Sequence, residues 1–595
     1  MFKCKQLLRR ICVVSYVFLL CGGLVNASNL VSKTNTLIGT QGNGWASGYL
    51  YPGATYPFGM VQFTPTYFTK QLGFVINQLS GAGCDHMGNF PTLPIAGALR
   101  VSPDSILNMQ TPVGKEIGTA GYYAATVDHS IRAELTVTER TGMARYTFSS
   151  KEKQGTVIIG GGVAATSIQV AAIKITGPHS CEGYAEGGAF CGIPTPYKVY
   201  FVAEFDADAE SFGTWKEERL HANHTFAEGS HSGVYFTFPL KEGNQAVQYK
   251  IGVSYVSVEN ARENLRVENP AWDFSAVRQA TQDKWNEYLG KIEVEGDNED
   301  RQMQFYTHLY RSLIHPNVCS DVNGEYMGAD SQVHKTARKF YTSFSNWDTY
   351  RTQTALIAML APEETSDIVM SHYLFAEQSG GGFPRWVLAN IETGVMQGDP
   401  TPILVANAYA FGARNYDPRT LLRTMRYGAE VPGANSQGVL TRPGLEQYLE
   451  KGYYDASILL EYTSSDFAIG RFALQACNDE PVCNWYTQRA MNWKNLFNKE
   501  TGWLQSRNED GSWKRYDADW RESTYKNYFW MVPYDIAGLI EIIGGKAAAE
   551  KRLDEFFTRL DAGYNDAWFA SGNEPSFHIP WIYNWVGTPY KAQEI

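Results

Sequence analysis

The segment "VQYKIGVSYVSV" (247–258), followed by "AWDFSAVRQATQDKWNEYLGKI" (271–292), marks a change of period in this sequence. The first stretch is rich in Val, Tyr and Ser and is typical of a β-strand, whereas the second carries apolar residues at helical spacing. The change predicts two halves of different secondary structure, joined by a helix within 271–292.

The region from about residue 30 to this boundary predicts many strands without intervening helices. Apolar runs rich in Val, Tyr, Phe and Thr recur there, separated by Gly, Asn and Pro, as in "ELTVTER" (134–140), "YKVYFVAEF" (197–205) and "VYFTF" (234–238). Such a series of strands is typical of a β-sandwich. We therefore predict an N-terminal β-sandwich domain at 28–267.

The region after Arg301 instead shows apolar residues at helical spacing. Examples are "RQMQFYTHLYRSLIHP" (301–316), "TPILVANAYAFGARN" (401–415) and "KAAAEKRLDEFFTRLDA" (546–562). Short loops that join antiparallel helices favour an α/α array. We predict a helical linker at 268–300 and an α/α domain at 301–595.

The composition is that of a globular, acidic protein. Its 595 residues carry a formal charge of −11, which argues against nucleic acid as the main partner. Aromatic residues make up 14%, and their flat apolar faces suit sugar rings, although large aromatic cores would explain the same composition. The sequence does not determine the oligomeric state.

The N-terminus, "MFKCKQLLRRICVVSYVFLLCGGLVNAS" (1–28), has the pattern of a signal peptide. A positively charged start precedes an apolar core at 11–20 and a small-residue cleavage site at 25–27. We predict a signal peptide at 1–27 and an exported protein, periplasmic or secreted, without a membrane span after cleavage. A lipoprotein anchored at Cys21 is disfavoured because the preceding Leu20 is bulky.

Six of the nine cysteines lie outside the predicted signal peptide. In an oxidising compartment Cys181 could pair with Cys191, and Cys477 with Cys483, because each pair is close in sequence. Buried free thiols are the alternative.

Carboxylates, amides and aromatic residues gather in four segments of the helical half, "SNWDTYR" (345–351), "NIETGVMQGDP" (390–400), "DADWRESTYKNYFWMVPYD" (517–535) and "SGNEPSFH" (571–578). Each Asp or Asn could simply cap a helix. Paired carboxylates also suit glycoside hydrolysis, and oxygen-rich loops suit Ca²⁺. The residues fit both kinds of chemistry.

The sequence resembles glycoside hydrolase family 92, the exo-acting α-mannosidases. The resemblance rests on seven blocks in the same order over nearly all the mature chain, at 38–65, 79–94, 309–328, 341–351, 390–398, 522–545 and 572–591. It implies an N-terminal β-sandwich and a C-terminal six-hairpin α/α barrel. It also implies Ca²⁺-dependent, inverting removal of terminal α-mannose from a mannose-containing glycan, with a Glu as general acid and an Asp as general base.

The resemblance also implies roles for particular residues. Glu522 matches the general acid, and Glu574 with Asn573 matches the metal-binding segment. Trp347 and Asp348 match the sugar-binding pair of the −1 subsite. Further candidates for substrate contacts are Arg385, Glu392 and His578.

The sequence departs from the family pattern in several places. Ser523-Thr524 and Asn527 follow the acid where the family usually has Gly-Asn and Gln, and Phe577-His578 replaces a His pair. The family's base lies in an Asp-Asp-x-Gly-Gln-Met segment that this sequence lacks. We therefore expect a truncated member, with part of the barrel missing and little or no activity. Turnover would require another base, such as Asp519 or Asp517.

Three alternatives remain open. The first is a carbohydrate-binding protein without catalysis. The second is a glycosidase or lyase of other sugar specificity on the same architecture, because fold does not fix function. The third is a secreted scaffold protein.

Overall fold

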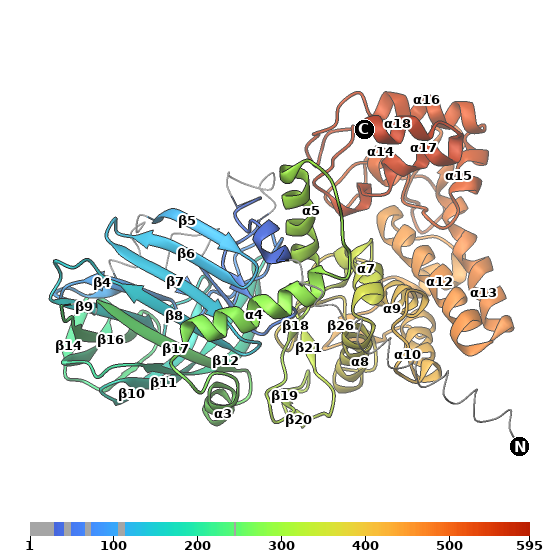
Figure 1. Cartoon of the computed structure of the whole chain (residues 1–595). Helices are drawn as coiled ribbons and strands as arrows, with labels where there is room; N and C mark the ends of the chain where they lie inside the picture. The colour runs from blue at the N-terminus through green and yellow to red at the C-terminus, as the bar shows by residue number, and fades with distance from the viewer. Residues whose placement is uncertain (1–28, 41–48, 66–72, 105–112, 243–244) are drawn as a thin grey trace, which may run out of the picture.

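The computed structural model describes residues 29–40, 49–65, 73–104, 113–242 and 245–595. The chain folds into a β-rich part and a helical part that lie side by side (Figure 1). The predicted signal peptide, 1–27, lies outside the described residues. The predicted order, a β-sandwich followed by a helical domain, is confirmed.

Two antiparallel sheets form the β-rich part. Within the described residues one sheet has eight strands, in the order β1 (Ala54–Thr55), β2 (Gln62–Pro65), β3 (Phe74–Val75), β4 (Thr92–Ala96), β9 (Gln154–Gly160), β16 (Ser232–Pro239), β13 (Ser211–Lys216) and β14 (Arg219–Ala222). The other has nine, in the order β15 (Phe226–Glu228), β10 (Ile168–Gly177), β11 (Ser180–Phe190), β12 (Ile193–Phe205), β17 (Ala246–Ser254), β8 (Thr141–Thr147), β7 (Ile131–Val137), β6 (Tyr122–Val127) and β5 (Val113–Thr119).

The sandwich core follows from the alternation read in the sequence. Along β7, Ile131, Ala133 and Leu135 are fully buried, whereas Arg132 and Glu134 between them are partly exposed. Successive side chains of a strand point to opposite faces of the sheet. The same cluster of buried residues extends into the helical part, where it includes Trp386. The two domains therefore share part of their apolar core.

The cysteine pairing predicted from sequence proximity is wrong. The disulfide joins Cys84 to Cys191, 107 residues apart, whereas Cys181, Cys477 and Cys483 are buried free thiols. Cys181 lies at the start of β11 and Cys191 just beyond its end, so an extended strand separates them by about 33 Å. A disulfide requires Cα atoms within about 7 Å.

Three helices connect the sandwich to the helical domain: α3 (Val258–Glu268), α4 (Phe274–Leu289) and α5 (Glu299–Ser312). Each helix is capped at its N-terminus by a side chain that accepts a backbone N–H of the first turn. The capping residues are Ser257, Asp273 and Asn298 respectively, and they satisfy part of the helix N-terminus. On α4, the Trp285 indole donates to the Thr55 carbonyl at 2.7 Å. The helix predicted within 271–292 is therefore α4, and it is anchored to the sandwich.

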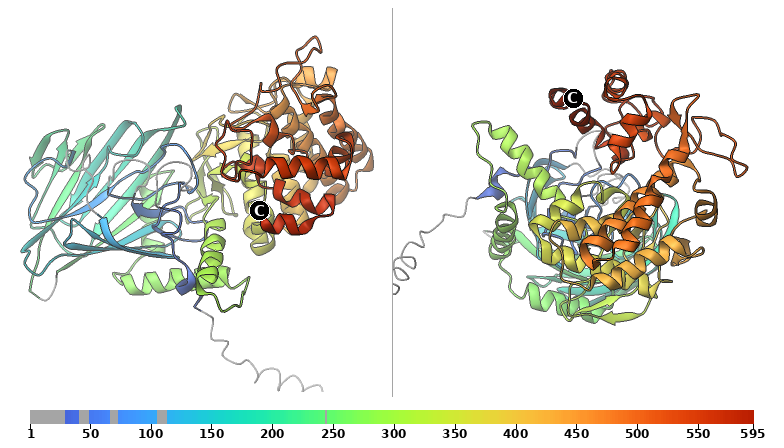
Figure 2. Two further views of the ribbon diagram at one scale, coloured as in Figure 1. Left: turned by 90° about the horizontal axis from the view of Figure 1, so that it is seen from above. Right: turned by 90° about the vertical axis from the view of Figure 1, so that its right-hand side faces the viewer.

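The helical domain follows, and several of its helices are separated by long segments, such as those between Gln378 and Thr401 and between Ala490 and Tyr525. In the view from the helical end, the helices follow one another in chain order around an arc (Figure 2, right). They are α6 (Asn346–Thr349), α7 (Gln353–Leu360), α8 (Pro362–Gln378), α9 (Thr401–Ala410), α10 (Pro418–Glu430), α11 (Leu445–Lys451), α12 (Ala456–Cys477), α13 (Glu480–Ala490), α14 (Tyr525–Tyr528), α15 (Ile536–Ile542), α16 (Lys546–Phe556), α17 (Tyr583–Val586) and α18 (Pro589–Glu594).

Helix α12 is the buried centre of this array. Its buried residues lie on every side, including Glu461 and Asp466, as expected of a helix surrounded by protein. It packs against α9, α10 and α13. In the part of the chain that the structure describes, no helix is long and apolar enough to span a membrane.

Short strands stiffen the loops of the helical domain. The pairs are β18 (Asn317–Val318) with β21 (Tyr341–Thr342), β19 (Glu325–Met327) with β20 (Val333–Lys335), β25 (Asn435–Ser436) with β26 (Val439–Leu440), and β27 (Phe497–Asn498) with β28 (Trp503–Leu504). A three-stranded sheet joins β22 (Phe344–Ser345), β23 (Trp386–Leu388) and β24 (Ile391–Glu392). This last sheet carries the candidate site.

Candidate active site

The three-stranded sheet places Asp348 beside Trp386. Ser345 at the end of β22 pairs with Trp386 at the start of β23, and α6, which contains Asp348, begins directly after β22. Trp386 and Asp348 line the same pocket, and the Trp386 side chain is among the groups that oppose the rise in the pKa of Asp348 caused by burial. The loop "SNWDTYR" and the segment before "NIETGVMQGDP" therefore meet at one wall of a pocket.

This pocket is lined by both domains. Leu79, Ser80 and Ala82 come from the sandwich domain, and Asp348, Trp386 and Glu574 come from the helical domain. Burial also raises the pKa of Tyr564 to about 12, and the Glu522 and Glu574 carboxylates raise it further. Such a recess between domains is a common place for a ligand site.

Three of the predicted site carboxylates are close enough here for their charges to affect the pKa of Asp348 and of Glu574. Burial raises the pKa of Asp348 well above its usual range, and the Glu574 and Glu522 carboxylates raise it further, while Arg351 opposes them. Burial also raises the pKa of Glu574, and Glu522 adds to this effect while Arg351 opposes it. Like charges in a recess disfavour simultaneous ionisation. Such an arrangement is common at functional sites.

Glu522 stands at the edge of the group. Burial raises its pKa and Arg521 opposes this effect. Its backbone lies in the left-handed region with φ 49°, a conformation that costs a non-glycine residue about 1 kcal/mol or more and that is frequent at active sites. It also borders a polar pocket with Gln397, Asp455 and Asp519.

An amide network fixes the loop that carries Glu574. Asn573 donates from Nδ2 to the Glu522 carbonyl at 2.6 Å and accepts the Glu574 N–H at 3.1 Å. Asn527 Oδ1 accepts the Ser576 hydroxyl at 2.9 Å, and its Nδ2 donates to the Trp568 carbonyl at 2.9 Å. Asn527 was noted in the sequence only as a departure from the family pattern, yet it joins α14 to this loop.

Arg351 brings a positive charge to the carboxylates and is itself held by Glu461 of α12. Its guanidinium lies 2.7 Å from Glu461 Oε1. Glu461 also accepts the Trp347 indole N–H at 3.0 Å and the Tyr350 hydroxyl at 3.0 Å. Trp347 is fully buried, so it lies behind the pocket wall. The aromatic residues that line the pocket are Trp386 and Phe577, and sequence reasoning missed Trp386.

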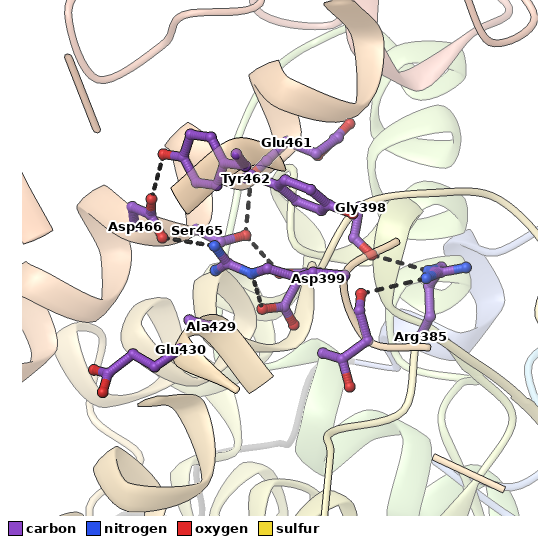
Figure 3. A network of polar contacts seen from close by, with 12 residues as sticks. Arg385, Gly398, Asp399, Ala429, Glu430, Glu461, Tyr462, Ser465 and Asp466 are labelled. Atoms are coloured by element: carbon purple, nitrogen blue, oxygen red, sulfur yellow. Dashed lines mark hydrogen bonds and ion pairs between the residues drawn. The ribbon is translucent and has the colours of Figure 1, made fainter. Parts of the chain in front are cut away.

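Arg385 and Glu392 lie apart from this pocket. Arg385 donates to the carbonyl of Gly398 at 2.9 Å (Figure 3) and to the carbonyl of Leu440 at 3.1 Å. Glu392 accepts the backbone N–H groups of Arg385 at 2.6 Å and Trp386 at 3.2 Å. Both therefore hold the loop that positions Trp386. Their role as substrate contacts stays a prediction.

A buried charge network supports the same loop from α12. Arg442 bridges Asp399 at 2.8 Å and Asp466 at 2.7 Å, and Arg489 binds Asp466 as well. Figure 3 shows Asp399 and Asp466 within this network. All of these groups are buried and paired, as buried charges must be to be tolerated. Asp399 thus belongs to the scaffold. A second predicted loop carboxylate, Asp535, is also structural, because it caps α15 by accepting the Gly538 N–H.

His578 lines a neighbouring pocket together with Arg351 and Glu574. Its Nε2 lies 2.6 Å from the Trp530 carbonyl. Burial lowers its pKa to about 4, so the ring is neutral at pH 7 and Nε2 carries the proton that it donates.

The residues fit a divalent cation in part. Glu574 offers a carboxylate, but Asn573 already uses both ends of its amide. Among the described residues, no group of three or more His, Cys, Asp or Glu side chains is arranged to hold a metal ion. A hard cation at Glu574 would therefore need water or substrate oxygens to complete its shell.

A β-sandwich joined to an α/α domain, with carboxylates at the pocket between them, is an arrangement that suits a two-domain glycoside hydrolase. Residues 34–254 match the glycosyl hydrolase family 92 N-terminal domain, and residues 260–595 match the glycosyl hydrolase family 92 catalytic domain. The chain belongs to glycosyl hydrolase family 92, and its helical domain corresponds to the α/α barrel of that family.

Known proteins with similar sequences or structures agree with this assignment. An uncharacterized secreted glycosidase of Arthroderma benhamiae is 25% identical over 94% of this chain and 77% of its own length. The family GH92 α-mannosidase BT3965 from Bacteroides thetaiotaomicron is 25% identical, with a TM-score of 0.85 over 95% of this chain and 79% of that one.

The inverting mannosidase BT2199 from the same organism is 25% identical, with a TM-score of 0.84 over 95% of this chain and 81% of that one. BT3965 has also been solved in complex with mannoimidazole.

Proposed function

We propose that this chain is an exo-acting hydrolase that removes terminal α-mannose from glycans by an inverting mechanism. The observation that carries the proposal is that Asp348 and Glu574 line one pocket between the two domains, close enough to Glu522, at the adjoining polar pocket, for its charge to raise the pKa of both. The similar mannosidases support the choice of sugar.

Glu522 is suited to act as the general acid. Its raised pKa keeps a larger fraction of the carboxyl protonated at a given pH, so that it can donate a proton to the glycosidic oxygen as the bond to the sugar breaks. Asp348 would bind sugar hydroxyls. The negative charge that Asp348 and Glu574 carry between them would stabilise the positive charge that develops on the sugar ring in the transition state.

A carbohydrate-binding protein without turnover is the second candidate, and the surroundings of Glu522 favour it. An inverting enzyme needs a carboxylate that activates water. The two carboxylates considered as substitutes for the family's base are paired with cations, Asp519 with Lys514 at 2.9 Å and Asp517 with Arg515. Lys514 also binds Asp455 at 2.7 Å.

One experiment separates the two candidates. The folded chain is given α-mannobiosides, and release of mannose is followed beside calorimetric binding of mannoimidazole. Release that is lost in Glu522→Gln supports the hydrolase. Binding without release supports the second candidate. A protein that binds neither mannose nor mannoimidazole would refute both and favour a glycosidase of other specificity.

We also propose Ca²⁺ as the cofactor, held in part by Glu574. A divalent cation would supply positive charge to the sugar site and relieve the repulsion between carboxylates. Adding Ca²⁺ should raise the Tm of the wild type, because a ligand that binds only the folded state stabilises it, and EDTA should reverse the shift. Glu574→Gln should abolish the shift, whereas Glu509→Gln, at an exposed pair with Lys451, should retain it.

We propose further that the protein is exported, on the strength of the N-terminal pattern described above. A mature N-terminus near residue 28, found by sequencing protein from the culture or periplasm, would support this.

A further inference from the structure

The sandwich domain reaches the candidate site through two segments that are far apart in the sequence. One is the loop after β3, from which Leu79, Ser80 and Ala82 line the pocket. The other is the turn between β11 and β12, which carries Phe190 and Cys191. Neither segment belongs to the catalytic domain.

Phe190 packs directly on Trp386 of the catalytic domain. Their ring centroids are 4.2 Å apart with an interplanar angle of 26°, and both side chains are at most 5% exposed. Stacked aromatic pairs of this kind stabilise a fold by more than the burial of their apolar area alone. Trp386 pairs through its backbone with Ser345, three residues before Asp348, and both Trp386 and Asp348 line the pocket, so the position of Phe190 bears on the pocket wall that carries Asp348.

The two sandwich segments are fastened to each other beside this stack. The disulfide joins Cys84 of the loop to Cys191, the residue after Phe190. His86 also lies edge-on against Phe190 at 6.1 Å, and its Nε2 accepts the Leu79 N–H at 2.7 Å. The pocket-lining loop and the turn that supports Trp386 therefore form one cross-linked unit.

We propose that Phe190 is a positioning residue, which acts through Trp386 to orient Asp348 toward the sugar and is held in place by the Cys84–Cys191 disulfide. The proposal rests on the proposed function of Asp348 in sugar binding. It makes the affinity for a mannose-like ligand depend on a residue of the N-terminal domain and on the oxidation state of one disulfide. Misplacing a binding group by about 1 Å can reduce activity about 100-fold.

The test compares Phe190→Leu with Phe236→Leu. Phe236 is equally buried, but its aromatic neighbours, Phe205, Phe212 and Phe238, all belong to the sandwich. Both variants should lower the Tm. Only Phe190→Leu should weaken mannoimidazole binding, by about tenfold or more, and Phe190→Tyr, which keeps the ring, should recover most of the affinity.

The disulfide is tested separately. Dithiothreitol should weaken mannoimidazole binding to the wild type, while Cys191→Ser should bind weakly from the start and should not respond to dithiothreitol. Equal weakening by Phe190→Leu and Phe236→Leu, or unchanged binding to Phe190→Leu, would overturn the proposal.

A readout that needs no sugar distinguishes this proposal from the proposed function. The difference in fluorescence between the wild type and Trp386→Phe reports the surroundings of Trp386. That difference should change in the Phe190→Leu background and on reduction of the disulfide, but not in Phe236→Leu. If it changes as expected while the wild type binds no mannoimidazole, only the proposed function fails. If it does not change, Phe190 does not position Trp386.

Discussion

Glu461→Gln tests how the catalytic pocket depends on the centre of the helical domain. Glu461 is completely buried and receives three donors, Trp347, Tyr350 and Arg351. The substitution keeps the shape of the side chain but removes its charge and one of its two acceptor oxygens. The Arg351 guanidinium, whose side chain is only 5% exposed, then loses the carboxylate with which it forms an ion pair.

The expected loss follows from the burial of this pair. Breaking a buried ion pair by removing one partner costs about 3–5 kcal/mol, because the remaining charge is left uncompensated. Since glutamine retains one acceptor, we expect the lower end, a fall of about 3 kcal/mol in the free energy of unfolding. Arg351 also lowers the pKa of Asp348 and Glu574, so its displacement should weaken mannoimidazole binding as well.

Urea unfolding and calorimetric binding measure these two effects. The matched control is Glu509→Gln in the same domain, where the partner Lys451 lies 3.5 Å away and the Glu509 side chain is 83% exposed. An exposed pair of this kind contributes about 0–1 kcal/mol. A loss in Glu461→Gln no larger than in Glu509→Gln would show that Arg351 does not depend on Glu461.

Three further predictions concern the pocket and the thiols. If the chain hydrolyses mannosides, Glu522→Gln should reduce mannose release about 10²–10⁴-fold while mannoimidazole still binds. The wild-type rate should fall as pH rises through the raised pKa of Glu522, because the acid must be protonated. The same fall in rate at alkaline pH in the variant would contradict this role. Asp348→Asn should raise the Tm at pH 7 and weaken mannoimidazole binding, since it removes a charge that Glu574 repels. Because the pKa of Asp348 is raised, the folded state binds more protons than the unfolded state. The wild type therefore loses stability as pH rises from 3.8, the ordinary pKa of the group, through the raised pKa. The gain in Tm of the variant should vanish below about pH 4, and a gain that persists there would refute this reason. Alkylation and peptide mass mapping without reduction should recover Cys84 linked to Cys191, with Cys181, Cys319, Cys477 and Cys483 alkylated only after unfolding; a Cys181–Cys191 peptide would contradict the assigned pairing.

Local sequence patterns predicted the elements well where burial follows the chain. The stretch "VYFTF" (234–238) lies within β16, and "TPILVANAYAFGARN" (401–415) contains α9. A strand or helix with one apolar face shows its period in the sequence, so its type can be predicted without its neighbours. The capping alternative was likewise correct for Asp535.

The site could be predicted only to the level of its loops. Asp348 and Glu574, 226 positions apart in the sequence, were both chosen from their motifs and do meet at one pocket. Glu392, chosen in the same way, accepts backbone N–H groups of its own loop instead. A motif names a residue type and a segment, but side-chain direction depends on the pairing of that segment with others.

The sequence by itself therefore determined the two-domain order, the type of most elements, the family and the loops that carry the carboxylates, because these depend on local periodicity and on motifs within one segment. Tertiary structure alone decided that Cys191 pairs with Cys84, that Trp386 and not Trp347 faces the pocket, and that Phe190 of the sandwich supports it. These contacts join residues far apart in the chain. The packing of whole sheets and helices against one another brings them together, and no local pattern records it.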